Sequence, residues 1–136
     1  MSETDKKTIL VVDDEPEVRK LVGAMVSLCG YAAMTADSGE HALTLYRNHK
    51  GPVELLITDV VQPGMSGPML ADKLTALQPG LKVLYISGYD HTHLVQKYVV
   101  EKGHALLAKP FTREGLRHKV EELLDVEQFL APANRR

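Results

Sequence analysis

The chain has 136 residues and a mass of 15.0 kDa, a length typical of one domain that buries roughly two-thirds of its unfolded surface. Its formal net charge of -2 gives no electrostatic reason to expect direct nucleic-acid binding. The single Cys29 excludes an internal disulfide, and no apolar run approaches the about 20 residues that span a membrane. We therefore expect a globular domain of the reducing cytoplasm.

The first strand-helix unit is clear in the pattern of apolar residues. Residues 8–12 form a continuous apolar run, as in a strand covered on both faces. A helical pattern follows from Pro16, which loses no hydrogen bond in a first turn, to Cys29, which we expect to be a buried, unreactive thiol. A weaker strand is predicted at 31–36.

The second and third units follow with clearer boundaries. Asp37, followed by Glu40, resembles a capping box and predicts a helix that continues through Tyr46. Residues 53–58 form the third predicted strand. The stretch 62–68 contains two prolines and two glycines, which predicts a turn-rich loop.

The remaining segments complete five units. A helix is predicted at 69–77, a strand at 81–86, a helix at 92–102 and a strand at 105–108; Thr112 is expected to cap a last helix that runs to about residue 126. Such alternation of strands and helices predicts an α/β fold with a doubly wound parallel sheet.

We expect a single domain over residues 8–126. Residues 1–7 are expected to be an extended or disordered start, and residues 127–136 a C-terminal tail. No linker or further domain is predicted after the last helix, so the chain is either a stand-alone protein or a piece of a larger one.

Polar side chains follow four of the predicted strands. Asp13 and Asp14 follow the first strand, Asp59 the third, Ser87 the fourth and Lys109 the fifth. Parallel strands present their carboxyl ends at one edge of the sheet, so we expect these groups to meet there. Carboxylates about 4 Å apart repel by roughly 4 kcal/mol per pair at an effective dielectric of about 20, which favours a bound cation. Magnesium fits best, because it takes one or two carboxylates together with waters and phosphate oxygens.

These residues also have a simpler interpretation. Asp13 and Asp14 could cap the following helix, Asp59 could close a turn, and Lys109 could be a surface lysine. His91 and His93 are expected to be solvated loop residues, and the other four histidines are scattered without metal-ligand spacing. The joint placement of the acidic residues, hydroxyl and ammonium favours the functional interpretation.

Four motifs carry these residues: Asp-Asp-Glu at 13–15, Thr-Asp-Val-Val-Gln-Pro-Gly-Met-Ser-Gly at 58–67, Ser-Gly-Tyr at 87–89 and Lys-Pro-Phe at 109–111. In this order and spacing they resemble the receiver domain of bacterial two-component response regulators, in the style of receivers attached to hybrid histidine kinases. The resemblance spans nearly the whole chain. It implies a five-stranded flavodoxin-like (βα)5 fold with strand order 2-1-3-4-5.

The resemblance also implies a role for each phosphoryl-site residue. Asp59 would accept a phosphoryl group from a histidine kinase or phosphotransfer protein. Ser87 would bind the phosphoryl group and move toward it, and Lys109 would neutralise its charge. The chain would be a signalling module, with no enzymatic activity beyond its own phosphorylation and dephosphorylation. The Lys109–Pro110 bond is expected to be cis, against a base rate of about 5–6%.

Magnesium is the cofactor that the resemblance implies. Asp14 and Asp59 would bind it directly with the backbone carbonyl of Val61, and Asp13 would act through water. The fourth helix, fifth strand and fifth helix would form the face that contacts an output partner or a second copy. Neither nucleic acid nor a membrane is an expected direct partner.

Three positions depart from the commonest receiver pattern. Leu106 stands where many receivers carry an aromatic residue that turns inward on activation, so Tyr89 or a backbone shift is expected to carry the signal. Val61 and Tyr89 should position attacking water poorly, which predicts slow self-dephosphorylation.

Three other functions fit the sequence less well. A magnesium-dependent phosphatase of the haloacid dehalogenase type also uses an aspartyl nucleophile, but it requires a second Asp where this chain has Val61. A nucleotide or flavin binder is poorly supported, because no glycine-rich phosphate-binding motif occurs. A phosphorylation-independent scaffold is disfavoured by the complete set of site residues.

Overall fold

The protein is described by a computed structural model over residues 6–124, so most of the expected start (1–7), the expected tail (127–136) and the side chain of Tyr89 lie outside the described residues. Five parallel strands form one sheet in the order β2-β1-β3-β4-β5, which confirms the predicted fold class and strand order. The strands are β1 (Thr8–Val12), β2 (Ala32–Ala36), β3 (Leu55–Asp59), β4 (Lys82–Ser87) and β5 (Ala105–Ala108).

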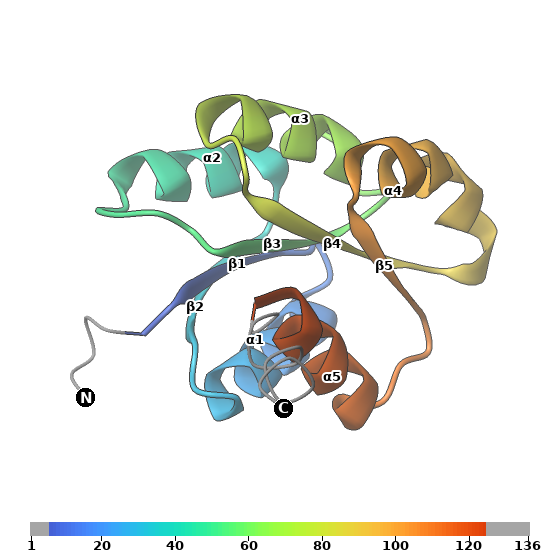
Figure 1. Ribbon diagram of the computed structural model, residues 1–136, viewed down its shortest axis with the longest axis horizontal. Helices are drawn as coiled ribbons and strands as arrows, with labels where there is room; N and C mark the ends of the chain where they lie inside the picture. The colour runs from blue at the N-terminus through green and yellow to red at the C-terminus, as the bar shows by residue number, and fades with distance from the viewer. Residues whose placement is uncertain (1–5, 125–136) are drawn as a thin grey trace, which may run out of the picture.

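Helices cover both faces of this sheet. They are α1 (Pro16–Leu28), α2 (Gly39–Asn48), α3 (Gly67–Leu77), a 3-10 helix η2 (Tyr89–Val95), α4 (Gln96–Lys102) and α5 (Arg113–Leu124). Helices α1 and α5 lie on one face, and α2, α3 and α4 lie on the other (Figure 1). Among the described helices, none combines the length and the apolar character needed to cross a membrane.

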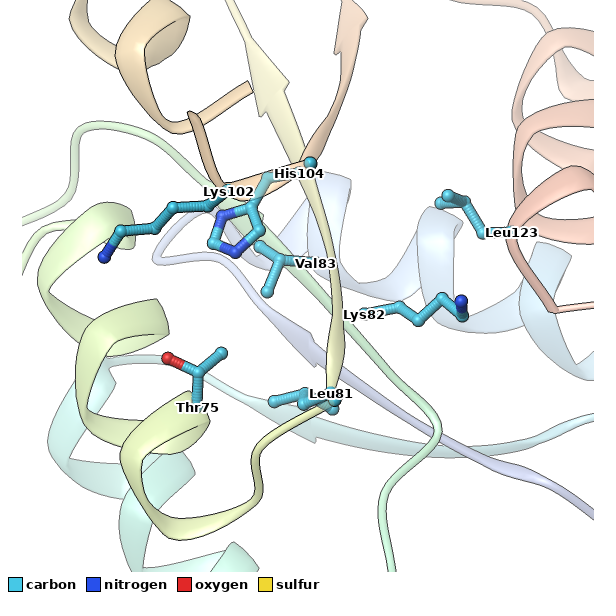
Figure 2. A pocket seen from close by; sticks show the side chains of 9 residues that line it. Thr75, Leu81, Lys82, Val83, Lys102, His104 and Leu123 are labelled. Carbon is cyan, nitrogen blue, oxygen red and sulfur yellow. The ribbon is translucent and has the colours of Figure 1, made fainter. Parts of the chain in front are cut away.

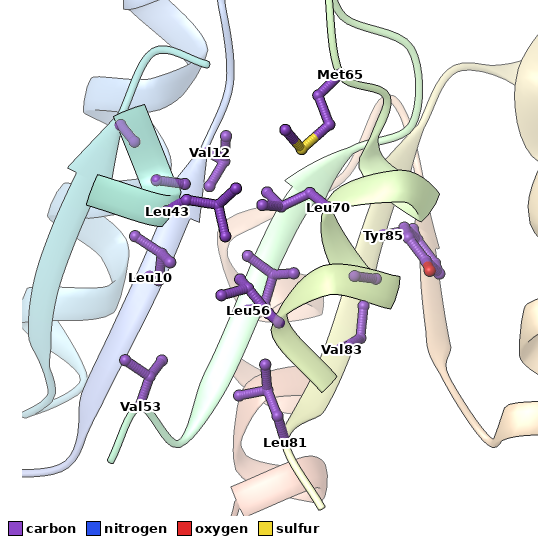
Figure 3. Close-up of a cluster of buried hydrophobic side chains, with 14 of the residues drawn as sticks. Leu10, Val12, Leu43, Val53, Leu56, Met65, Leu70, Leu81, Val83 and Tyr85 are labelled. Atoms are coloured by element: carbon purple, nitrogen blue, oxygen red, sulfur yellow. The ribbon is translucent and has the colours of Figure 1, made fainter. Parts of the chain in front are cut away.

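Alternate residues of the strands enter two separate cores. Leu10, Leu56 and Tyr85 pack in the core between the sheet and α2, α3 and α4 (Figure 3). Ile9 and Ile57 pack in the core between the sheet and α1 and α5. Burial of each such side chain contributes about 1.5–3 kcal/mol. Because β1 is buried on both faces, its sequence is apolar throughout rather than alternating.

The start of α2 differs from the prediction. The N-cap is Ser38, whose hydroxyl accepts a hydrogen bond from the His41 N–H (3.1 Å), so the helix begins at Gly39. The predicted capping box of Asp37 with Glu40 is therefore wrong. The carboxylate of Asp37 instead lies 3.2 Å from the ring of His41.

The segment after β4 is not the single helix predicted over 92–102. It begins as the 3-10 helix η2, and the chain continues as α4 only after Val95, whose backbone (φ -115°, ψ 5°) interrupts the helical path. Val95 is fully buried, so its packing in the core accounts for the interruption. His91 and His93 lie in η2 and are exposed, as the sequence predicted.

The last unit follows the prediction. The Lys109–Pro110 bond is cis. The Thr112 hydroxyl accepts a hydrogen bond from the Gly115 N–H (2.9 Å) at the start of α5. This helix is described to Leu124, and its predicted end lies outside the described residues.

Cys29 differs from its predicted environment. It is only partly buried, because it forms the C-cap of α1 rather than a core position within the helix. Burial, followed by the nearby Glu121 carboxylate, raises the pKa of its thiol, which agrees with the expected low reactivity.

Candidate functional site

Three carboxylates meet at the carboxyl edge of the sheet. Strands β1 and β3 are parallel neighbours, and Asp13 and Asp14 directly follow the first while Asp59 ends the second. Each residue offers one oxygen, and these oxygens all lie within 4.8 Å of one another. In residues 6–124 this is the one group of three or more acidic, histidine or cysteine side chains arranged to hold a metal ion.

Asp13 is the most buried member of the cluster, with an exposed fraction of 3%. Its Oδ1 accepts a hydrogen bond from the Glu15 N–H (2.9 Å), and its backbone carbonyl accepts one from the Arg19 guanidinium (2.7 Å). Burial raises the pKa of its carboxyl from 3.8 to about 6, and the carboxylates of Asp59 and Asp14 add to this effect.

The raised pKa of Asp13 and the type of donor atoms together indicate whether a magnesium ion fits this site. The pKa values of the Asp13 and Asp59 carboxyls are raised, chiefly by burial, so a bound positive charge, whether a proton or a cation, stabilises the cluster. The donors are all hard oxygens, with neither thiolate nor imidazole among them, which suits magnesium rather than a softer metal. The residues therefore fit the ion.

The carboxylate of Asp59 is held in a defined orientation. Its Oδ1 accepts a hydrogen bond from the Val60 N–H (2.8 Å), and its Oδ2 lies 3.9 Å from Lys109 Nζ. Its backbone carbonyl accepts a hydrogen bond from the Thr58 hydroxyl (3.0 Å). Burial raises the pKa of the Asp59 carboxyl, and the Lys109 ammonium opposes this shift. The second oxygen thus faces the lysine and lacks a short hydrogen bond among the described residues.

The loop after Asp59 turns tightly against the end of β3. The Gly67 N–H donates to the Val60 carbonyl (2.9 Å), and a Cβ atom at residue 67 would collide with the Asp59 carbonyl oxygen. The Ser66 hydroxyl then caps α3 by accepting a hydrogen bond from the Met69 N–H (3.2 Å). Val61 lies in this loop with its side chain 45% exposed.

Lys109 brings a positive charge to the cluster from the end of β5. Its Nζ lies 3.9 Å from Asp59 and 3.7 Å from Glu15, and its side chain is 28% exposed. The Lys109 N–H donates to the Ser87 carbonyl (2.8 Å), which fixes the backbone. Sequence reasoning gave Glu15 no role, although its place in the Asp-Asp-Glu motif was the available signal.

Ser87 ends β4, between the strands that carry Asp59 and Lys109. It is fully buried, and it pairs with Ala108 in the sheet. Its hydroxyl donates to the carbonyl of Gly88 (2.9 Å). The structure therefore places Ser87 beside the cluster with its hydroxyl engaged in its own loop.

Two buried polar features were not anticipated from the sequence. Gln62 is 7% exposed, its amide nitrogen lies 3.4 Å from the Thr58 hydroxyl, and its Oε1 has no partner among the described residues. Tyr85 and His104 form a buried pair, with the hydroxyl 3.0 Å from Nδ1. For the Tyr85–His104 pair, the one available signal was the alternation along β4, which directs Tyr85 to the same face of the sheet as Val83.

Known proteins resemble this chain over most of its length. The response regulator receiver domain family matches residues 9–121. The response regulator receiver protein CpdR of Brucella abortus is 30% identical over 118 residues, which cover 87% of this chain and 97% of CpdR. A cyclic di-GMP phosphodiesterase of Thermotoga maritima is 33% identical over 117 residues, which cover 86% of this chain but 31% of that protein.

A solved structure agrees with these relatives. The receiver domain of the hybrid histidine kinase CckA superposes with a TM-score of 0.72 at 31% identity, covering 86% of this chain and 98% of that domain. The family match includes the acidic cluster, Ser87 and Lys109. The chain therefore belongs to the response regulator receiver domain family, whose members are the phosphoacceptors of two-component systems.

Proposed function

We propose that this receiver accepts its phosphoryl group on Asp59, from the histidine of a kinase or of a phosphotransfer protein. The observation that carries the proposal is the position of the Asp59 carboxylate, 3.9 Å from the Lys109 ammonium and within 4.8 Å of oxygens of Asp13 and Asp14. An Asp59 oxygen attacks phosphorus, and the new P–O bond forms as the P–N bond to the donor imidazole breaks. The imidazole leaves with the electron pair of the broken bond.

The neighbouring side chains stabilise the transferred charge. The Val60 N–H holds one oxygen of Asp59, so the carboxylate keeps its orientation during attack. The Lys109 ammonium binds a phosphoryl oxygen in place of its present contact with Asp59. The Ser87 hydroxyl exchanges the Gly88 carbonyl for a phosphoryl oxygen, which moves the end of β4 toward the site.

Magnesium is the proposed cofactor. Asp14, Asp59 and the backbone carbonyl of Val61 are the proposed direct ligands, with Asp13 acting through water. When bound, the ion neutralises charge on the carboxylates and on the phosphoryl oxygens. The close approach of the acidic oxygens and the raised pKa of Asp13 support this assignment.

The location and partners of this chain are proposed from its family membership and from the exposed residues on and next to α4. We propose a cytoplasmic location, because the kinase that supplies the phosphoryl group would draw it from ATP. The face formed by α4, β5 and α5 is proposed to contact an output partner or a second copy, since Val100 (80%) of α4 and Leu94 (47%) of the preceding η2 are exposed. The phosphatase and scaffold alternatives are not favoured by the family match.

Intact-mass analysis after incubation with acetyl phosphate and magnesium tests the proposal. Wild-type protein should gain one phosphoryl adduct, dependent on magnesium. Asp59→Asn should gain none, while Asp37→Asn, which alters an exposed carboxylate outside the cluster, should behave as wild type. An adduct on Asp59→Asn, or no adduct on folded wild-type protein with a kinase donor as well, would contradict the proposal.

A separate variant tests the ligand assignment. Asp14→Ala should shift the magnesium dependence of phosphorylation to higher concentration, because a direct ligand is lost. Asp37→Ala is the matched control. Unchanged magnesium affinity in Asp14→Ala would remove Asp14 from the ligand set.

A further inference from the structure

The largest fully buried side chain of the described residues is Tyr85, on β4 two residues before Ser87. Its hydroxyl lies 3.0 Å from Nδ1 of His104, which immediately precedes β5 and is 9% exposed. Burial raises the pKa of the Tyr85 phenol and lowers the pKa of the His104 imidazole, so both groups are neutral at neutral pH. The pair is thus a hydrogen bond between neutral groups inside the protein.

Helix α4 is attached to this pair by an aromatic side chain. The Tyr98 ring packs edge-on to Tyr85, with 6.2 Å between centroids, and lies 6.0 Å from the His104 ring. The Tyr98 hydroxyl donates to Asp72 of α3 (3.1 Å), and Lys102 binds the other oxygen of the same carboxylate (2.9 Å). We call these five residues the Tyr85 cluster.

Apart from its buried N-cap residue Val95, α4 itself is weakly embedded in the core. None of its seven residues is buried, whereas every other α-helix contributes buried side chains to a core. The Tyr85 cluster therefore supplies much of the attachment of α4 to β4, β5 and α3. Loss of one of its hydrogen bonds should affect α4 more than the rest of the sheet.

The Tyr85 cluster also adjoins the phosphoacceptor strand. In the sheet, Tyr85 pairs with Thr58 of β3 on one side and with Leu106 of β5 on the other. Thr58 directly precedes Asp59 and donates to its carbonyl. Leu106 offers no aromatic ring, and Tyr85 is the fully buried aromatic residue of the core beside β5.

The edge of the Tyr85 cluster borders on open space. His104 and Lys102 line a cavity of about 380 Å³ at the amino-terminal edge of the sheet, together with Thr75, Leu81 and Val83 (Figure 2). Close-packed side chains can change position only where there is room. Because the His104 imidazole lines this cavity, it has space to change position.

We propose that the Tyr85 cluster holds α4 in the conformation described here, and that phosphorylation of Asp59 releases α4 by displacing the end of β4. The trigger rests on the proposed function of Asp59 and Ser87, whereas the hold on α4 does not. A shift of Ser87 toward the phosphoryl group moves β4 relative to β5, which separates Tyr85 from His104. The residue that reports phosphorylation to α4 is then Tyr85 rather than an aromatic at position 106.

The hold on α4 is tested on unphosphorylated protein by amide hydrogen exchange. Tyr85→Phe removes only the hydroxyl, and Tyr98→Phe removes only the bond to Asp72. Both should speed exchange in α4 by about fivefold, the effect of losing one hydrogen bond, while β1 and β3 stay unchanged. Tyr46→Phe is the matched control, because its hydroxyl donates to Gln78 (2.9 Å) far from α4. Exchange in α4 at the wild-type rate in both Tyr85→Phe and Tyr98→Phe would overturn the hold.

The release is tested by the same measurement after phosphorylation with acetyl phosphate and magnesium, with the adduct quantified by mass. Exchange in α4 of the wild-type protein should rise to the level of unphosphorylated Tyr85→Phe, and phosphorylated Tyr85→Phe should show no further rise. Unchanged exchange in fully phosphorylated wild-type protein would overturn the release alone. Failure to form the adduct would overturn the proposed function and the trigger with it, while the variant comparison still decides the hold.

Discussion

The carbonyl oxygen of Asp59 occupies the space in which a side chain at Gly67 would begin. The Gly67 N–H also donates to the carbonyl of Val60, one residue further along the chain. The first turn of α3 therefore packs directly on the strand end that carries the phosphoacceptor. Only glycine allows this approach, so the position of the Asp59 carboxylate depends on residue 67.

Gly67→Ala should lower the free energy of unfolding by about 1–3 kcal/mol, because the new methyl group forces the Asp59 backbone away. The phosphoryl adduct should also form more slowly. Urea denaturation and intact-mass analysis measure the two effects. Gly88→Ala is the control, since a Cβ at residue 88 meets no atom within 4 Å. Equal stabilities for the two variants would show that the loop tolerates the methyl group.

Asp13→Asn should stabilise the magnesium-free protein at pH 7. The pKa of Asp13 is raised from 3.8 to about 6, so the folded protein binds this proton more tightly than the unfolded chain does. The resulting stability is fully present below the unfolded pKa and is lost as the pH rises through about 6. We expect a gain for Asn of the order of 1–2 kcal/mol at pH 7 and little difference below pH 4.

Urea denaturation in EDTA at several pH values measures this difference. Asp37→Asn serves as the control, because that carboxylate lies outside the cluster. Added magnesium should stabilise the wild-type protein more than Asp13→Asn. If the two proteins were equally stable at pH 7 without magnesium, burial of the ionised Asp13 carboxylate would carry no cost.

The fold and the acidic cluster could be predicted from the sequence because both depend on local patterns. The apolar run before Asp13 and the run before Asp59 are strands, and parallel strands place their ends at one edge. Once the motifs suggest the strand order, the meeting of these carboxylates follows from topology alone.

The contacts between distant side chains could not be predicted in this way. The pairing of Tyr85 with His104 depends on the register of β4 against β5 and on the burial of a histidine that has no motif around it. Ser38 rather than Asp37 caps α2 because the helix begins one residue later than predicted, and this boundary depends on the backbone conformation of Ser38. The break at Val95 depends on core packing, which outweighs local helical propensity.

Val61→Asn should shorten the lifetime of the phosphorylated protein. The side chain of Val61 is 45% exposed in the loop beside Asp59, and it offers no hydrogen bond to an attacking water. An amide there can orient that water, so we expect hydrolysis about fivefold faster or more, a modest share of what a positioned polar group contributes. The decay of the adduct mass after removal of acetyl phosphate measures the rate. Val100→Asn, an exposed change on α4, should leave the rate unchanged, and an unaltered lifetime in Val61→Asn would refute the prediction.

Two glutamines, the buried Gln62 and the partly buried Gln78, differ in how their amides are hydrogen-bonded. Gln78 accepts hydrogen bonds from the Tyr46 hydroxyl (2.9 Å) and the Val53 N–H (3.2 Å), and it donates to the Val53 carbonyl (2.7 Å). Gln62 has one weak contact to Thr58 (3.4 Å), and its Oε1 has no partner among the described residues. The same substitution should therefore change stability in opposite directions at the two positions.

Gln62→Met should raise the free energy of unfolding by about 1–2 kcal/mol, because it removes a buried acceptor whose missing hydrogen bond costs about 1–3 kcal/mol. Methionine has a similar length and adapts to irregular space. Gln78→Met should lower the free energy of unfolding by about 2–3 kcal/mol, since it leaves the backbone groups of Val53 unpaired. Urea denaturation of both variants at one magnesium concentration provides the comparison. A loss of stability in Gln62→Met equal to that in Gln78→Met would mean that Gln62 Oε1 is satisfied in solution, with a buried water as its partner.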